Sequence, residues 1–171
     1  AEALISFIVV LSLIIAGVYA SYALWDNNRV YASAGDVQDD MIKLKPKIEE
    51  DESGPSFEDL LVVNSDVRAW VSLDNTEIDY PILQGDTNLS YINTDVYGNF
   101  ALAGSIFLDS RNDANFLDTY SLLYGHNMEN SRMFGDLNLY KEEKFFRENQ
   151  TGTLILPDRV YILEIEIGRA H

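Results

Sequence analysis

The pattern of the chain begins with an uninterrupted apolar block. Ala3 to Trp25 contains no charged residue, a run of 23 positions. An α-helix of that length spans roughly 34 Å, against about 30 Å for the hydrocarbon core of a bilayer. Aromatic side chains gather at the end of the block, at Tyr19, Tyr22 and Trp25, as is typical of a membrane–water interface. The pattern therefore predicts a transmembrane helix over residues 1–25.

A cleaved signal peptide is the competing interpretation of this block. Small residues at positions 18–20 and 32–34 would allow cleavage, but the apolar run exceeds the about 7–15 residues of a usual signal core. We therefore expect a retained anchor. The size of the downstream part favours a single-pass protein of the cell membrane whose main domain is extracellular.

Residues 26–55 are mostly polar and predict a helical stalk followed by an acidic linker. Apolar positions between residues 26 and 45 partly follow helical spacing, and Pro46 interrupts that spacing. Residues 49–52 are all acidic and are followed by Ser53, Gly54 and Pro55. We expect a solvated hinge there, without a binding role.

From residue 56 the spacing of apolar residues changes from helical to the apolar–polar alternation that is typical of strands. Ser56 and Asp59 predict a capping box at the start of a short helix. Pro81 predicts a sheet edge or a bulge, and the apolar run before Gly125 predicts a buried strand. Short strands with brief helices predict a mainly β, barrel-like domain over residues 56–167. Strands are predicted at residues 68–73, 78–82, 104–109, 122–124, 152–156 and 161–167, and helical turns at 87–92, 133–140 and 142–148.

Charge and composition exclude several function classes. The net charge is −16 with a pI near 4.2, which argues against nucleic acid as a partner and against attraction to anionic lipid headgroups. The chain has no cysteine. It therefore contains no disulfide, no thiolate metal ligand and no thiol nucleophile.

The candidate for chemistry is His126, which follows the predicted strand and Gly125. The other histidine, His171, is the last residue. The segment from Arg132 to Leu137 predicts an amphipathic turn that closes over the end of the strand. A histidine so placed suits acid/base work, although a lone histidine is also commonly a hydrogen-bonded structural residue.

Two other chemistries are less favoured by the pattern. A serine hydrolase would need a nucleophile elbow, and no Gly-x-Ser-x-Gly is present. Oxygen ligands after the predicted strand at 104–109 do not follow the EF-hand spacing, so a polar turn is the simpler interpretation. We expect no metal and no cofactor. The residues concerned are Ser105, Ser110, Ser121 and Ser131 for the hydrolase, and Asp109, Asn112 and Asp113 for the cation.

Several motifs in order resemble the class B sortases, which are membrane-anchored transpeptidases of Gram-positive bacteria. The resemblance runs from about Phe57 to Glu166, and the N-terminal anchor fits the same family. The motifs are Val67–Val71, Ile78–Gly85, Tyr91–Asn93, Gly104–Asp109 with Arg111 and Asn112, Leu123–Met128 and Met133–Leu137.

The resemblance implies an eight-stranded sortase barrel and a cysteine transpeptidase. Such enzymes cleave a sorting motif of the Asn-Pro-x-Thr-Asn type, or a pilin variant, after the threonine. An amine of lipid II, the cell wall or a pilin then resolves the thioacyl-enzyme. His126 matches the family's acid/base histidine. Asn88 and Ile92 match positions of the substrate groove, and Tyr124 stands beside the histidine, although Asn88 could equally cap a helix.

The family's cysteine and arginine belong to later strands that this sequence does not contain. Residues 168–171 do not resemble the family, and Arg169 lacks the strand context of the catalytic arginine. We therefore expect a chain that is C-terminally truncated, lacks the last two strands and is inactive by itself. The alternative is a membrane-anchored, non-catalytic remnant or a module that binds sorting motifs. Either way, the strand at 161–167 should be an exposed apolar edge that promotes association or a molten state of the part from Asp26 on.

Overall fold

The computed structural model describes residues 2–47 and 54–166. The predicted acidic linker at residues 49–52, the end of the last predicted strand at Ile167 and the tail at 168–171 lie outside the described residues. The elements, in chain order, are α1 (Glu2–Ile42), α2 (Phe57–Val63), β1 (Val67–Leu73), β2 (Asp79–Leu83), β3 (Ile106–Leu108), β4 (Leu123–Tyr124), the 3₁₀ helix η1 (Gly135–Lys141), α3 (Glu143–Glu148), β5 (Thr151–Ile155) and β6 (Val160–Glu164).

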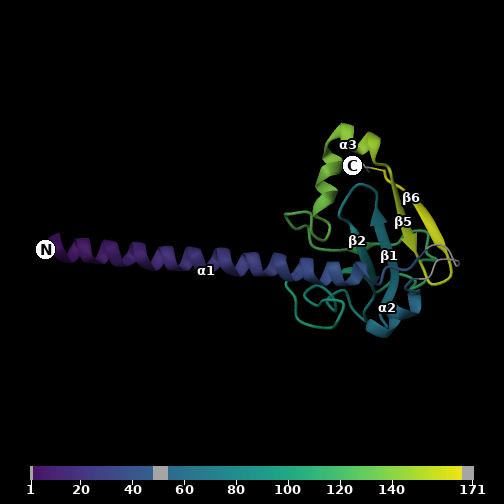
Figure 1. The fold of residues 1–171 in the computed structure, drawn as a ribbon, viewed down its shortest axis with the longest axis horizontal. Coiled ribbons are helices and arrows are strands. Elements are labelled where there is room, and N and C mark those ends of the chain that lie inside the picture. Colours follow the sequence, from purple (N-terminus) through teal and green to yellow (C-terminus); the bar gives the residue numbers. More distant parts are fainter. Residues whose placement is uncertain (1, 48–53, 167–171) are drawn as a thin grey trace.

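Helix α1 extends far from the rest of the chain, and only its last turns contact the folded domain (Figure 1). Its apolar part is fully exposed and is long and apolar enough to cross a membrane, a property that an N-terminal signal sequence shares. The predicted anchor and the predicted stalk form one continuous helix, because the polar residues after Trp25 keep helical spacing until Ile42. The helix ends four residues before Pro46.

The domain is built on one mixed six-stranded sheet in the order β4-β3-β2-β1-β5-β6. Neighbouring strands are antiparallel except β2 and β3, which run parallel with Ile82 opposite Ile106. A parallel pair needs a long crossover, and residues 84–105 supply it. The prediction of a sheet of short strands with brief helices is confirmed, with six strands among the described residues.

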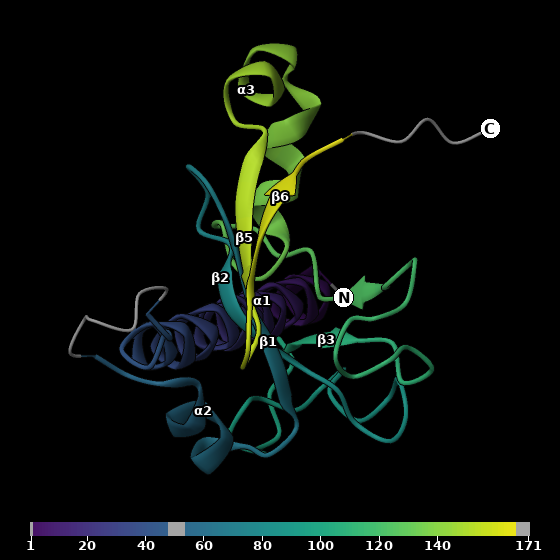
Figure 2. The ribbon, with the colours of Figure 1, turned by 90° about the vertical axis from the view of Figure 1, so that its right-hand side faces the viewer.

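Alternation along the strands produces two apolar faces. In β1, Ala69 and Val71 face one cluster, whereas Trp70 faces the other. Helix α2 packs on the Trp70 side through Phe57 and Leu60. The N-terminus of α2 is held as predicted, because the Ser56 N–H donates to the Asp59 carboxylate at 2.8 Å. Figure 2 shows α2 beside the last turns of α1.

Local details differ from the prediction at two strands. Pro81 lies in β2, an interior strand, opposite Trp70 of β1, so it marks no sheet edge, although the register of this pair shifts close by, between Val67 and Ala69. An interior proline is tolerated because the pairing of β2 with β3 starts only at Ile82. Strand β4 is half-buried rather than buried, since it is the last strand at one edge of the sheet. The helical turn predicted at 87–92 is present as a run of turns, and the helical segment predicted at 133–140 is a 3₁₀ helix that starts at Gly135.

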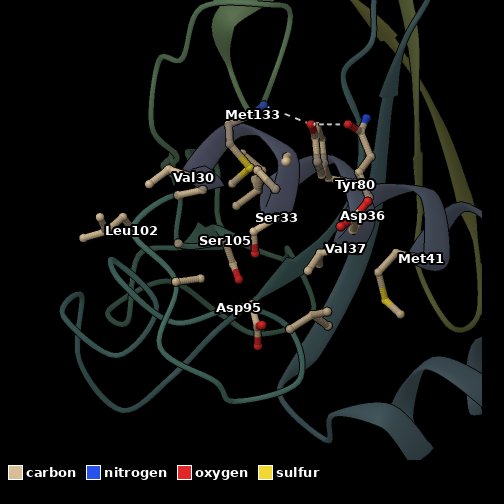
Figure 3. A pocket seen from close by; sticks show the side chains of 18 of the residues that line it. Val30, Ser33, Asp36, Val37, Met41, Tyr80, Asp95, Leu102, Ser105 and Met133 are labelled. Carbon is tan, nitrogen blue, oxygen red and sulfur yellow. Dashed lines mark hydrogen bonds between the residues drawn. The ribbon is translucent and has the colours of Figure 1, made fainter. Parts of the chain in front are cut away.

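A buried polar network attaches the end of α1 to the sheet and to the loop after β4. The Tyr80 hydroxyl donates to Gln38 Oε1 at 2.7 Å and accepts from the Met133 N–H at 2.9 Å (Figure 3). Arg132 donates to the same Gln38 oxygen at 2.7 Å. Gly35 allows this approach, because a Cβ there would lie 2.8 Å from Arg132 Nη2. The network therefore connects residues that are about a hundred positions apart in the chain.

Candidate active site

His126 lies at the end of the edge strand β4, one residue after Gly125. Its side chain is exposed, and its Nε2 lies 2.9 Å from the carbonyl oxygen of Ile92. A carbonyl can only accept a hydrogen bond, so Nε2 carries the proton in this contact and the neutral ring keeps Nδ1 as its acceptor. The fold thus holds the imidazole by one nitrogen and leaves the other available for proton transfer.

Gly125 is required by the close packing behind the histidine. A Cβ at this position would lie 2.3 Å from Ile106 Cδ1 and 2.8 Å from the ring of Phe134. Both distances are far below a normal contact. The chain can therefore turn directly from β4 into His126 only because residue 125 has no side chain.

The segment after His126 folds back over the end of the strand, as the sequence predicted. The Phe134 N–H donates to the His126 carbonyl oxygen at 2.9 Å, and Asn127 pairs with Met133 as an isolated antiparallel bridge. Gly135 permits the closure, because a Cβ there would lie 1.9 Å from the Met128 carbonyl oxygen. The Tyr80 hydroxyl holds this loop through the Met133 N–H, so hydrogen bonds connect the segment after His126 to Gln38 of α1.

A second cluster lies around Asp109, which directly follows β3 and is only 2% exposed. Arg111 donates to its two carboxylate oxygens at 2.9 and 2.7 Å. Asn88 donates to Asp109 Oδ2 at 2.9 Å, and the Tyr124 hydroxyl donates to the same oxygen at 3.0 Å. Arg111 holds the pKa of the Asp109 carboxyl well below its ordinary value, with help from the Arg111 N–H, Asn88 and Tyr124.

The Asp109 carboxylate in turn raises the pKa of the Tyr124 phenol. The Tyr124 ring also stacks on Phe107 of β3, with centroids 5.3 Å apart. Asn88 reaches further, since its Oδ1 accepts from the Ser110 N–H at 2.7 Å. Asn88 therefore caps no helix; it fixes the turn that follows β3.

The structure brings the four predicted site residues together in two pairs. His126 contacts the Ile92 carbonyl, and Tyr124 and Asn88 meet on the Asp109 carboxylate. Because β3 and β4 are antiparallel, His126 beyond the end of β4 and Asp109 beyond the end of β3 lie at opposite ends of this strand pair. The sequence predicted a polar turn at Asp109 in preference to a cation site, but not its role as the common acceptor; the Asp-x-Arg spacing after a strand was the available signal.

Comparison with known proteins identifies the relatives of this arrangement. No protein-family model matches the chain. Sortase B of Staphylococcus aureus is 38% identical over 96 residues, which cover 56% of this chain and 39% of the relative. Sortase B of Listeria monocytogenes is 43% identical over 93 residues, which cover 54% of this chain and 38% of the relative. The chain thus spans about two-fifths of the length of these curated relatives.

Comparison with solved structures finds the same relatives. A Streptococcus pyogenes class B sortase involved in pilus biogenesis is 43% identical with a TM-score of 0.61, over 63% of this chain and 60% of that one. Sortase B from B. anthracis is 32% identical with a TM-score of 0.64, over 82% and 65%. The chain is related to the class B sortases.

Within this sortase-like domain, the two alternative chemistries gain no geometric support. Among the described residues, the His126 ring bonds to a carbonyl and to no serine hydroxyl, and the Ser105 hydroxyl donates to the Thr94 carbonyl at 2.8 Å. Asn112 uses its amide to bridge Asp118 and the backbone of Leu122. The side chain of Asn112 in the turn after β3 is therefore satisfied by hydrogen bonds to nearby residues of the same loop.

Proposed function

We propose that this chain carries the acid/base half of a sortase-type transpeptidase site. The observation that carries the proposal is the placement of His126: it is exposed beyond the end of β4, its Nε2 is held by the Ile92 carbonyl, and its own carbonyl accepts from the Phe134 N–H. The sortase B relatives support the reaction class. The remaining predicted positions, Asn88, Ile92 and Tyr124, are proposed to line the groove that receives the substrate.

The proposed reaction has two halves. A thiolate attacks the threonine carbonyl of a sorting motif of the Asn-Pro-x-Thr-Asn type or a pilin variant, the peptide C–N bond breaks, and His126 protonates the leaving amine. An acceptor amine of a cell-wall precursor or a pilin then attacks the thioester, loses its proton to His126 and releases the thiolate. A protonated ring can keep Nε2–H on the Ile92 carbonyl while Nδ1–H serves the leaving amine.

The thiolate is the part that these residues do not supply. The sequence contains no cysteine, so in this proposal the nucleophile comes from outside the 171 residues and the chain alone forms no thioacyl intermediate. The proposed location is the outer side of the cell membrane, with α1 as the anchor, because the apolar part of α1 has the length and composition of a membrane span.

A second candidate function is a membrane-anchored module that binds a sorting motif without cleaving it. The absence of cysteine from these residues is compatible with it, because a groove needs no thiolate to hold a peptide. The DNA downstream of the codon for His171 distinguishes the candidates. Continuation into a strand with cysteine and a strand with arginine supports the enzyme, whereas a stop codon with accumulation of folded protein supports the binding module.

The groove itself can be tested by NMR on the full chain with ¹³C,¹⁵N-labelled histidine. An Asn-Pro-Gln-Thr-Asn peptide should shift the His126 ring signals, and a scrambled peptide should not. The His126→Gln variant assigns the signal while keeping an N–H donor for the Ile92 carbonyl. The absence of a peptide-dependent shift refutes the proposed groove. Cleavage of the peptide by the purified chain, detected by mass spectrometry, refutes the need for an external thiolate.

A further inference from the structure

The crossover between β2 and β3 exposes apolar side chains to an unusual extent. Phe100 is 77% exposed, Leu102 51% and Tyr97 44%. They lie within six residues of one another, so they form one apolar tip, which we call the 97–102 tip. An exposed apolar cluster of this kind commonly marks a surface that binds a partner or a membrane.

The 97–102 tip is rigidly built. Asp95 is 7% exposed, and its Oδ1 accepts from the N–H groups of Tyr97 at 2.9 Å and Asn99 at 2.8 Å. Phe100 pairs with Thr94 as an isolated bridge, and Gly98 takes a φ of 82° that favours glycine. The exposure of Phe100 is therefore imposed by the backbone rather than by an unstructured loop.

The tip faces the part of α1 that follows its apolar block. Phe100 and Leu102 line a cavity of about 500 Å³ together with Asp26, Arg29 and Val30 of α1. Figure 3 shows Leu102 and Val30 at one end of this cavity and Met41 at the opposite end. Figure 1 shows teal and green loops on the side of the domain from which α1 extends.

The level of the tip relative to a membrane follows from helix geometry. Val30 lies five residues beyond Trp25, which corresponds to about 7.5 Å of rise. The headgroup layer on each side of the hydrocarbon core is about 5–7 Å thick. Trp25 has Arg29 over its ring at 5.0 Å and Tyr22 beside it at 6.0 Å, an arrangement typical of the interfacial layer. This rise puts Val30, and Leu102 near it (Figure 3), at the outer boundary of that layer.

We propose that Phe100 and Leu102 insert into the interfacial layer of the membrane that α1 spans, so that the domain touches the bilayer at a second point. The contact is apolar and therefore needs no anionic lipid. A chain of net charge −16 is in fact repelled by anionic headgroups. The Ala101 N–H donates to the Asn93 carbonyl at 3.0 Å, next to Ile92. Insertion of the tip would therefore fix the height of Ile92, and with it the His126 ring, above the membrane.

The absence of native cysteine allows a direct depth measurement. The full chain is reconstituted in phosphatidylcholine nanodiscs with one nitroxide label at Phe100→Cys, and the accessibility of the label to oxygen and to a water-soluble nickel chelate is measured by EPR. The matched control is Val62→Cys, which is 87% exposed on α2, an element beside the last turns of α1 and away from its apolar block (Figure 1). Ile14→Cys, in the middle of the apolar block, reports whether α1 spans.

The oxygen-to-nickel ratio at residue 100 is expected to be several-fold higher than at residue 62 and lower than at residue 14. It should not increase when anionic lipid is added. Equal ratios at 100 and 62 overturn the proposal, as does a water-accessible label at residue 14. Spin–spin broadening at residue 100 that disappears on dilution with unlabelled protein also overturns it, because the tip would then contact a second copy of the chain.

Discussion

The Tyr80 hydroxyl offers the sharpest test of how α1 and the site loop are coupled. Tyr80→Phe removes the donor to Gln38 and the acceptor of the Met133 N–H. Gln38 keeps Arg132 as a partner, but the Met133 N–H, on a residue only 4% exposed, is left without one. A lost hydrogen bond costs about 0.5–1.5 kcal/mol and an unsatisfied buried group about 1–3 kcal/mol. We expect a loss of about 3 kcal/mol.

Urea denaturation followed by circular dichroism measures this loss. With an m-value near 2 kcal/mol/M, the midpoint should fall by about 1.5 M while m stays constant. Amide exchange by mass spectrometry should accelerate around Met133, because the loop after His126 loses its attachment. Tyr120→Phe is the matched control, since Tyr120 is 72% exposed. A Tyr80→Phe midpoint within the error of the wild type would refute the network as a stabilising connection.

The raised pKa of Tyr80 predicts that the free energy of unfolding depends on pH in the alkaline range. Burial raises the pKa of Tyr80 from 10.0 to about 12. The unfolded chain therefore loses the proton at lower pH than the folded chain, so the stabilisation is complete below pH 10 and is lost as pH rises from 10 to about 12. The difference corresponds to about 3 kcal/mol. Tyr80→Phe should lack this alkaline loss, and an identical alkaline profile in both proteins would contradict the assignment.

Three further changes test other parts of the domain. Gly135→Ala should lower the free energy of unfolding by about 1–3 kcal/mol by urea denaturation, because the added Cβ meets the Met128 carbonyl. In the wild type, Arg111 lowers the pKa of Asp109 from its ordinary value of 3.8, so the charged Asp109 stabilises the fold above that pH and the stabilisation is lost as pH falls below it. Asp109→Asn should remove this pH-dependent stabilisation, which thermal melts between pH 2 and 6 measure. Ile162→Lys, at a 75% exposed position of the edge strand β6, should reduce self-association in light scattering of residues 26–171.

Each of these changes has a control. Gly17→Ala places its Cβ in open space, with nothing within 4 Å, so it should leave unfolding of the domain unchanged. Arg111→Gln should reproduce the altered acid profile of Asp109→Asn, and a normal profile would show that another group causes the shift. Val62→Lys adds the same charge on α2, away from the sheet edges. Equal solubility of both lysine variants would mean that net charge, rather than the β6 edge, governs association.

The sequence by itself determined where the strands and helical segments lie along the chain, but not the order of the strands in the sheet. Alternation is a local property, and it located β1, β2, β5 and β6 to within a few residues. The uninterrupted apolar block identified the membrane-type helix. Gly125 followed by His126 located the histidine at a strand end, because a glycine there ends an apolar run in a way that depends on neighbouring residues only.

The tertiary structure decided everything that depends on residues far apart in the chain. The contact of Gln38, Tyr80 and Met133 joins a helix, a strand and a loop, and no local pattern encodes it. Pro81 was misplaced for the same reason, since the parallel partner of β2 begins only one residue later. The burial of Asp109 under Arg111 likewise arises from the packing of β3 against β4 and the crossover. The periodicity and composition of the sequence determine on which face of an element a side chain lies, whereas only tertiary packing determines which residues it contacts.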